Sequence, residues 1–203
     1  MNILVVNSAY KTKLMLISDK SEKVLEAQID EKTNDKLLEH IENLLKQRKL
    51  ALKDVDAIAV CVGPGSFTGL RASISLIKGI SMASSVKVLP FTSFEEIEYN
   101  KGDYLVLEGF SNFVYTLYKG EAKCQEIDLV KCEIQKISGK VLCKTEALKE
   151  KFSGAQLATL KTQELIKQKY IAKSFCDIGE IEPLYLRASQ AEIEREKKQN
   201  GKN

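Results

Sequence analysis

The stretch DAIAVCVGPGSFTGLRASISLIKGIS, residues 56–81, limits the fold of this chain more than any other. Its first part, residues 56–62, is almost continuously apolar, which predicts a strand covered on both faces. A turn rich in glycine and proline follows at once, and residues 69–85 carry the spacing of a helix. A buried strand that runs through a turn into a helix indicates a mixed α/β domain.

The rest of the chain extends this pattern into two halves. The first half is predicted to hold strands at 2–7, 13–18, 23–29 and 86–91 and helices at 33–48 and 92–97. The second is predicted to hold strands at 104–110, 113–120, 122–127 and 140–144, a helix at 160–173 and an extended segment at 183–189. We therefore divide the chain into residues 1–100, residues 101–189 and a charged tail over 190–203.

Composition excludes several classes of protein. The 203 residues are 44% hydrophobic and 29% charged, as in an ordinary globular protein, and the net charge of +3 does not favour direct nucleic-acid binding. No apolar run approaches 18 residues, and the N-terminus does not resemble a signal peptide, so we expect no membrane association and a cytoplasmic location. Five cysteines without a C-x-x-C pair and a single histidine, His40, indicate neither a disulfide framework nor a metal site.

The glycine turn does not match three familiar catalytic loops. It lacks the lysine of a phosphate-binding P-loop, its third glycine comes one place late for the dinucleotide fingerprint, and Pro64 stands where a nucleophile elbow needs glycine. Two interpretations remain open. The glycines either allow only a tight reversal of the chain, or they also present backbone N–H groups to an anion at the helix start. The candidate anion contacts are Gly63, Gly65, Ser66, Thr68, Gly69 and Arg71.

Both helices of the first half carry apolar stripes. The helix at 69–85 is apolar over roughly 200° of its surface, more than one face of a sheet needs. It is either fully buried within its own domain or packs one side on a partner. On the second interpretation, the candidate partner-binding residues are Leu37, Ile41, Leu45, Leu70, Ile74, Ile77 and Ile80.

The string GPGSFTGLR, with the apolar strand before it and EPLYLRAS near the C-terminus, resembles the signature of the bacterial TsaB (YeaZ) family. The resemblance is strong over most of residues 1–100 and weaker beyond. It implies an actin-like ATPase (ASKHA, ribonuclease H-like) fold, with two similar halves that each hold a mixed sheet flanked by helices. It also implies a role in making threonylcarbamoyladenosine in transfer RNA, as a subunit that pairs with the catalytic subunit TsaD through helices of its N-terminal half.

Three departures from the family pattern erode a nucleotide or metal site. Asn7 stands where the family usually has an aspartate that orients magnesium and phosphate, Thr33 replaces a histidine, and Glu108–Phe110 replaces the string D-A-R. An amide binds a hard cation weakly because it carries no charge. The departures leave the signature turn and the leucine stripes unchanged.

The sequence therefore predicts a non-catalytic partner subunit that binds and stabilises a TsaD-like catalytic subunit, alongside a TsaE-like ATPase. We expect transfer RNA to be reached only through the complex, no cofactor to be required, any ATP or ADP to lie near the subunit interface, and a homodimer to form when the chain is alone. The alternative is an active small-molecule kinase or ATPase of the same fold, for which Glu108 is the remaining acid. A peptidase, which needs a metal, is the least favoured.

Overall fold

The computed structural model describes residues 1–19, 21–29 and 36–187, without side-chain detail for 21–24. The chain forms two compact units, which are described separately. The first comprises Met1–Asn100 and Leu157–Leu184, and the second comprises Lys101–Gln156 and the residues from Tyr185 onward. The boundary between Asn100 and Lys101 lies where the sequence predicted a division between the two halves. Leu157–Leu184 was assigned to the second half, and this assignment is corrected because the segment belongs to the first unit. The predicted tail over 190–203 lies outside the described residues, as do Thr33 with the start of the helix predicted at 33–48 and the last two residues of the extended segment predicted at 183–189.

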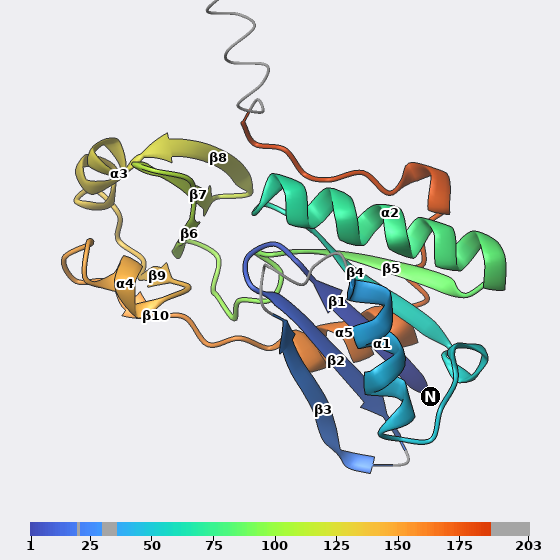
Figure 1. Ribbon diagram of the computed structural model, residues 1–203. Helices are drawn as coiled ribbons and strands as arrows, with labels where there is room; N and C mark the ends of the chain where they lie inside the picture. Colours follow the sequence, from blue (N-terminus) through green and yellow to red (C-terminus); the bar gives the residue numbers. More distant parts are fainter. Residues whose placement is uncertain (20, 30–35, 188–203) are drawn as a thin grey trace, which may run out of the picture. The chain divides into compact units, whose positions relative to one another are not determined.

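The first unit is built on a five-stranded mixed sheet with the order β3-β2-β1-β4-β5. Its strands are β1 (Asn2–Asn7), β2 (Thr12–Ser18), β3 (Ser21–Ile29), β4 (Ala57–Gly63) and β5 (Lys87–Thr92). The first three form an antiparallel meander, while β4 pairs in parallel with both β1 and β5. Figure 1 shows α1 (Leu37–Lys46) in front of this sheet and α5 (Thr162–Ile171) behind it.

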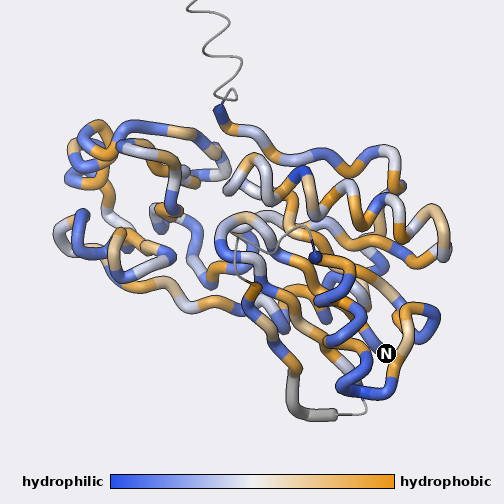
Figure 2. Tube along the Cα trace, in the orientation of Figure 1, coloured by the Kyte–Doolittle hydropathy of each residue, from blue (hydrophilic) through white to orange (hydrophobic). Residues whose placement is uncertain are grey.

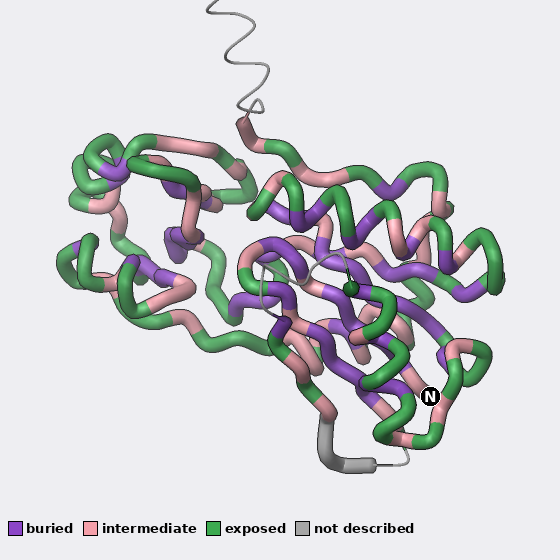
Figure 3. Tube along the Cα trace, viewed as in Figure 1, coloured by how far each residue is buried: buried purple, intermediate pink, exposed green. Residues whose placement is uncertain are grey.

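Burial on both faces explains why β1 and β4 are continuous apolar runs. Their inner residues, such as Leu4 and Ile58, are fully buried, and the same strands are mostly hydrophobic in Figure 2 and buried in Figure 3. Helix α5 reaches this core through Ile166, which explains why a segment so late in the chain belongs to the first unit.

Helix α2 (Phe67–Ser84) begins directly after the glycine turn. The Ser66 side chain caps its N-terminus by accepting a hydrogen bond from the Gly69 N–H, and Ser85 ends it in the left-handed conformation with φ of 55°. Both ends are therefore set by serines, close to the limits predicted from the sequence.

The last segment of the first unit wraps over its edge. Cys176 pairs with Val88 of β5, and the 3₁₀ turn η3 (Ile178–Glu180) follows. The Leu184 N–H then donates to the Val62 carbonyl at 2.7 Å, just before the glycine turn. This segment protects part of an edge strand and tethers the end of β4.

The second unit repeats the connectivity of the first. Its sheet has the order β10-β9-β6-β7-β8, in which β6, β7 and β8 are antiparallel neighbours and β9 is parallel to β6. The strands are β6 (Tyr104–Glu108), β7 (Phe113–Tyr118), β8 (Glu121–Glu126), β9 (Val141–Cys143) and β10 (Gln156–Leu157). The prediction of two similar halves with mixed sheets is confirmed.

A polar network closes the second unit's core. The Tyr104 hydroxyl donates to the Glu133 carboxylate at 2.8 Å, and the Gln125 amide donates to the other Glu133 oxygen at 2.8 Å. Burial raises the pKa of Tyr104, so the phenol stays protonated and keeps donating. Glu133 comes from α3 (Ile127–Ile134), so the network joins that helix to the sheet.

Three short segments differ from the helices predicted from the sequence. The predicted helix at 92–97 is a single turn, in which Thr92 Oγ1 accepts from the Glu95 N–H while the Glu95 carboxylate accepts from the Thr92 N–H. The capping pattern is real, but Ile97 then bridges to Leu160 and leaves no room for a second helical turn. In the other direction, α3 and α4 (Glu146–Lys149) were not predicted, because their apolar periodicity covers two turns or fewer.

Candidate functional site: the signature turn and the outer face of helix α2

Three loops meet at the carboxyl ends of the parallel strands of the first unit. They follow β1 at Asn7, β4 at Gly63 and β5 at Thr92, and in open α/β sheets this edge is where ligands bind. The signature turn is therefore in the place that a phosphate site would take.

Each glycine that begins the turn or the helix is required by close contacts. Gly63 has φ of +110°, and a Cβ there would lie 2.9 Å from Leu70 Cδ1. A Cβ on Gly65 would lie 2.1 Å from the Ala9 carbonyl oxygen, and one on Gly69 would lie 2.4 Å from the Ser8 carbonyl oxygen. The turn and the first turn of α2 pack directly on the backbone between β1 and β2, so the geometric interpretation accounts for all three positions.

Two backbone N–H groups that could bind an anion at the turn are already engaged within the chain. The Ser66 N–H donates to the Ala9 carbonyl at 2.5 Å, and the Gly69 N–H donates to Ser66 Oγ at 3.2 Å. Thr68 is exposed, and the Arg71 guanidinium lies 3.9 Å from the centre of the Phe67 ring. An anion contact at the turn stays a prediction.

Asn7 holds a buried carboxylate that the sequence analysis missed. Its Nδ2 group lies 3.1 Å from each carboxylate oxygen of Glu96, and its Oδ1 accepts from the Ala9 N–H at 3.0 Å. Thr162 Oγ1 of α5 also donates to Glu96, at 3.0 Å, and only 4% of Glu96 is exposed. An amide can donate on one side and accept on the other, which an ionised carboxylate at position 7 could not do.

This cluster explains why asparagine fits the end of β1. The Glu95–Glu96 pair is a sequence signal for this cluster, but two acids at this place are also typical of the first turn of a helix. Through Asn7, Ala9 and Ser66, hydrogen bonds run from Glu96 to the start of α2. The other remaining acid, Glu108 of the second unit, accepts a hydrogen bond from Thr145 at 2.9 Å.

The residues predicted to contact a partner are core residues. All of them are buried, with exposed fractions of 0–7%, and all belong to the hydrophobic core of the first unit: Leu37, Ile41, Leu45, Leu70, Ile74, Ile77 and Ile80. Their stripes face the unit's own sheet, so we correct their expected outward orientation. The apolar arc on α2 is wider than the core stripe because it includes Ala72 and Ala83, which are exposed, and Leu76, which is half-buried.

The opposite side of α2 is a continuous exposed surface, which we call the outer face. Its members recur at helical spacing and are mostly small: Thr68, Arg71, Ala72, Ser75, Gly79, Met82 and Ala83. Met82 is the one large apolar side chain in this set, and it is 77% exposed. A Cβ added at Gly79 would meet nothing within 4 Å, so the fold of this chain does not require glycine there.

The described residues hold neither a metal-binding cluster nor a membrane-spanning helix. Residues 1–19, 21–29 and 36–187 contain no group of three or more histidine, cysteine, aspartate or glutamate side chains placed to hold a metal ion. In the same part of the chain, no helix is long and apolar enough to cross a membrane.

Comparison with known proteins identifies the family. Residues 23–175 match the family model described as TsaD: tRNA N6-adenosine threonylcarbamoyltransferase. The chain belongs to the TsaD family.

Curated relatives of this TsaD-family chain match it over short segments. Two proteins named tRNA threonylcarbamoyladenosine biosynthesis protein TsaB, from Haemophilus influenzae and Buchnera aphidicola, are 34% identical over 58 residues and 36% identical over 53. These segments cover 29% and 26% of this chain, and the chain spans only 25% of the length of each relative in the match.

Solved structures are similar over nearly the whole chain. A Pseudomonas aeruginosa protein described as similar to the peptidase YEAZ has a TM-score of 0.71 at 18% identity, covering 92% of this chain and 99% of its own. YeaZ from the same organism has a TM-score of 0.69 at 16% identity, covering 91% and 99%. With the TsaB relatives, these matches confirm the resemblance to the TsaB (YeaZ) family and the actin-like fold.

Residues that match the C-terminal family motif, Tyr185–Arg187, lie in the second unit. Tyr185 is 40% exposed, and the Arg187 guanidinium lies 4.5 Å from the centre of the Phe113 ring on β7. The arginine therefore anchors the end of the described chain by a cation–π contact.

Proposed function

We propose that this TsaD-family chain is a non-catalytic subunit of the machinery that makes threonylcarbamoyladenosine in transfer RNA. It binds and stabilises a TsaD-type catalytic subunit through the outer face of α2. A TsaE-type ATPase completes the assembly in the cytoplasm, and transfer RNA is reached only through the complex.

The observation that carries this proposal is Gly79. Glycine inside a helix costs about 0.5–1 kcal/mol relative to alanine, and among the described residues nothing lies close enough to exclude a side chain there. A second helix that packs on the outer face supplies the missing reason, because small residues at 72, 75, 79 and 83 let two helix backbones approach closely. The same helical surface offers Met82, an adaptable apolar contact.

The Asn7–Glu96 cluster supports the non-catalytic part of the proposal. The amide at the end of β1 is engaged on both sides, by Glu96 and by the Ala9 N–H. It has neither the charge nor a spare donor for a magnesium-bound phosphate. We propose that any ATP or ADP at the subunit interface is not held by this group.

Calorimetric titration with a TsaD-type subunit, in the presence of ATP and a TsaE-type ATPase, tests the proposal. We expect binding in the micromolar range or tighter, and a loss of at least tenfold for Gly79→Leu, because the larger side chain holds the partner away. The matched control is Gln168→Leu, which adds an exposed leucine on α5. No association of the wild-type chain at micromolar concentrations would refute the proposal.

The kinase or ATPase alternative is tested by titrating Mg-ATP into the chain alone. Tight binding with turnover that is lost in Glu108→Gln would favour the enzyme. Gel filtration of the same sample tests the expected homodimer, which the outer face would form when no partner is present. Gly79→Leu should then shift the chain to a monomer.

A further inference from the structure

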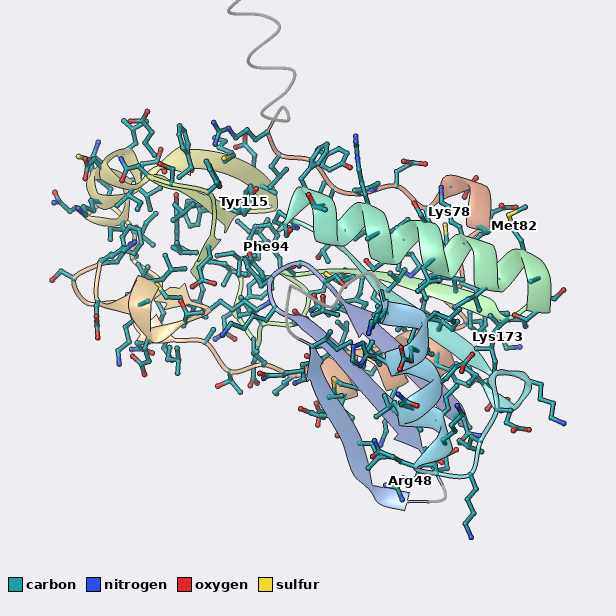
Figure 4. The ribbon with its side chains drawn as sticks, viewed as in Figure 1. Arg48, Lys78, Met82, Phe94, Tyr115 and Lys173 are labelled. Carbon is teal, nitrogen blue, oxygen red and sulfur yellow. The ribbon has the colours of Figure 1, made fainter. Side chains whose placement is uncertain are left out.

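Met82 differs from the other methionines of the chain. The sequence contains three, and Met15 is 5% exposed while the Met1 side chain is 12% exposed. Met82 is 77% exposed and lies on the outer face of α2, where Figure 4 labels it near Lys78. Its thioether is thus the only well-exposed methionine sulfur in the described residues.

The surroundings of Met82 leave its sulfur open. The residues one turn earlier on the helix are Lys78 and Gly79, and side chains at this spacing are the neighbours that could cover it. Gly79 has no side chain, and the Lys78 ammonium is paired with Glu182 at 3.0 Å. Neither neighbour therefore shields the sulfur from a small oxidant.

We propose that Met82 is a reversible oxidation site that controls docking on the outer face, an inference that rests on the function proposed above. The sulfur lone pair attacks one oxygen of hydrogen peroxide, the O–O bond breaks, and the products are methionine sulfoxide and water. The sulfur gives up two electrons and the peroxide takes them. A thiol-dependent sulfoxide reductase reverses the change, with oxidation of its thiols to a disulfide.

Oxidation changes what the outer face offers a partner. The thioether is apolar and fills irregular gaps, whereas the sulfoxide carries a strong hydrogen-bond acceptor that loses its water when a partner covers it. The surrounding outer face offers mainly small side chains at Ser75, Gly79 and Ala83. We expect association to weaken about tenfold, since an unsatisfied buried polar group has a cost of this order.

Limited peroxide treatment followed by peptide mass mapping and titration tests the inference. Met82 should be oxidised well before Met15, and the oxidised chain should bind the TsaD-type subunit about tenfold more weakly. Reductase treatment should restore binding. Peroxide treatment of Met82→Leu should leave its affinity for the TsaD-type subunit unchanged. Because both proteins carry the same cysteines, this result would exclude cysteine oxidation as the cause of the weaker binding.

The outcomes separate the two proposals. Equal binding by the oxidised and untreated chains, or oxidation of Met15 as fast as Met82, overturns the oxidation site and leaves the docking function standing. A failure of the untreated chain to bind overturns the docking function, and the oxidation site as its regulator with it. Loss of binding in peroxide-treated Met82→Leu assigns the effect to another residue and also overturns the inference.

Discussion

Replacing Asn7 by aspartate, the residue that the resemblance to the TsaB (YeaZ) family implies at this position, is expected to destabilise this chain. The carboxylate oxygens of Glu96 lie 3.1 Å from the amide nitrogen of Asn7, so the substitution places two carboxylates in contact at a site where Glu96 is 4% exposed. At an effective dielectric constant of about 20, two such charges repel by about 5 kcal/mol. The pair avoids this by holding one proton, as other carboxylate pairs do.

The cost of that proton sets the size of the effect. Keeping a carboxyl group with an ordinary pKa of about 4 protonated at pH 7 costs about 4 kcal/mol, at about 1.4 kcal/mol for each pH unit. The folded variant binds more protons than the unfolded chain above pH 4, so its stability falls as the pH rises. We therefore expect Asn7→Asp to lose about 4 kcal/mol at pH 7 and about 1.4 kcal/mol at pH 5.

Urea unfolding followed by circular dichroism measures this effect, since the chain has no tryptophan. The matched control is the exchanged pair Asn7→Asp with Glu96→Gln, in which the new amide donates to the new carboxylate and Thr162 keeps its acceptor. It should recover most of the lost stability at pH 7. A pH-independent loss in Asn7→Asp, or no recovery in the exchanged pair, would show that the hydrogen bonds of Asn7 do not explain its presence.

Three further predictions follow from the geometry of the core and the turn. Gly65→Ala should cost at least 3 kcal/mol in urea unfolding, because its Cβ would lie 2.1 Å from the Ala9 oxygen and the backbone would have to move; a neutral result would contradict the contact. Ile77→Ala should lower the free energy of unfolding by about 2–5 kcal/mol and leave the affinity of the folded molecules for the partner unchanged, since the side chain is 1% exposed. Weaker binding without a loss of stability would show instead that Ile77 contacts the partner. Iodoacetamide at pH 8 should label exposed Cys132 and spare Cys143, because burial raises the pKa of the Cys143 thiol to about 12; equal labelling in mass spectra would argue against that burial.

The sequence was most informative where one feature fixes the local structure. The apolar run of β4, the glycine turn and the length of α2 agree with the structure, because turn chemistry and periodicity act locally. The return of Leu157–Leu184 to the first unit could not be predicted, since it depends on where Ile166 finds a core.

The candidate site was predicted in part. The described parts of both helices lie where the sequence predicted them, but their apolar stripes pack on the unit's own sheet and not on a partner. An apolar periodicity indicates that a face is covered and not what covers it. The informative residue was Gly79, because its exposure on α2 is visible only in the structure. Glu96 was missed because the partners of a buried carboxylate, Asn7 and Thr162, are distant in sequence.

Site-specific photocrosslinking tests the central claim most directly. A photoreactive phenylalanine analogue placed at Ser75, on the outer face of α2, should crosslink to the TsaD-type subunit in the assembled complex. The same analogue at Gln168, exposed on α5, should not. Crosslinks from Gln168 with none from Ser75, in a complex that still forms, would contradict docking on the outer face.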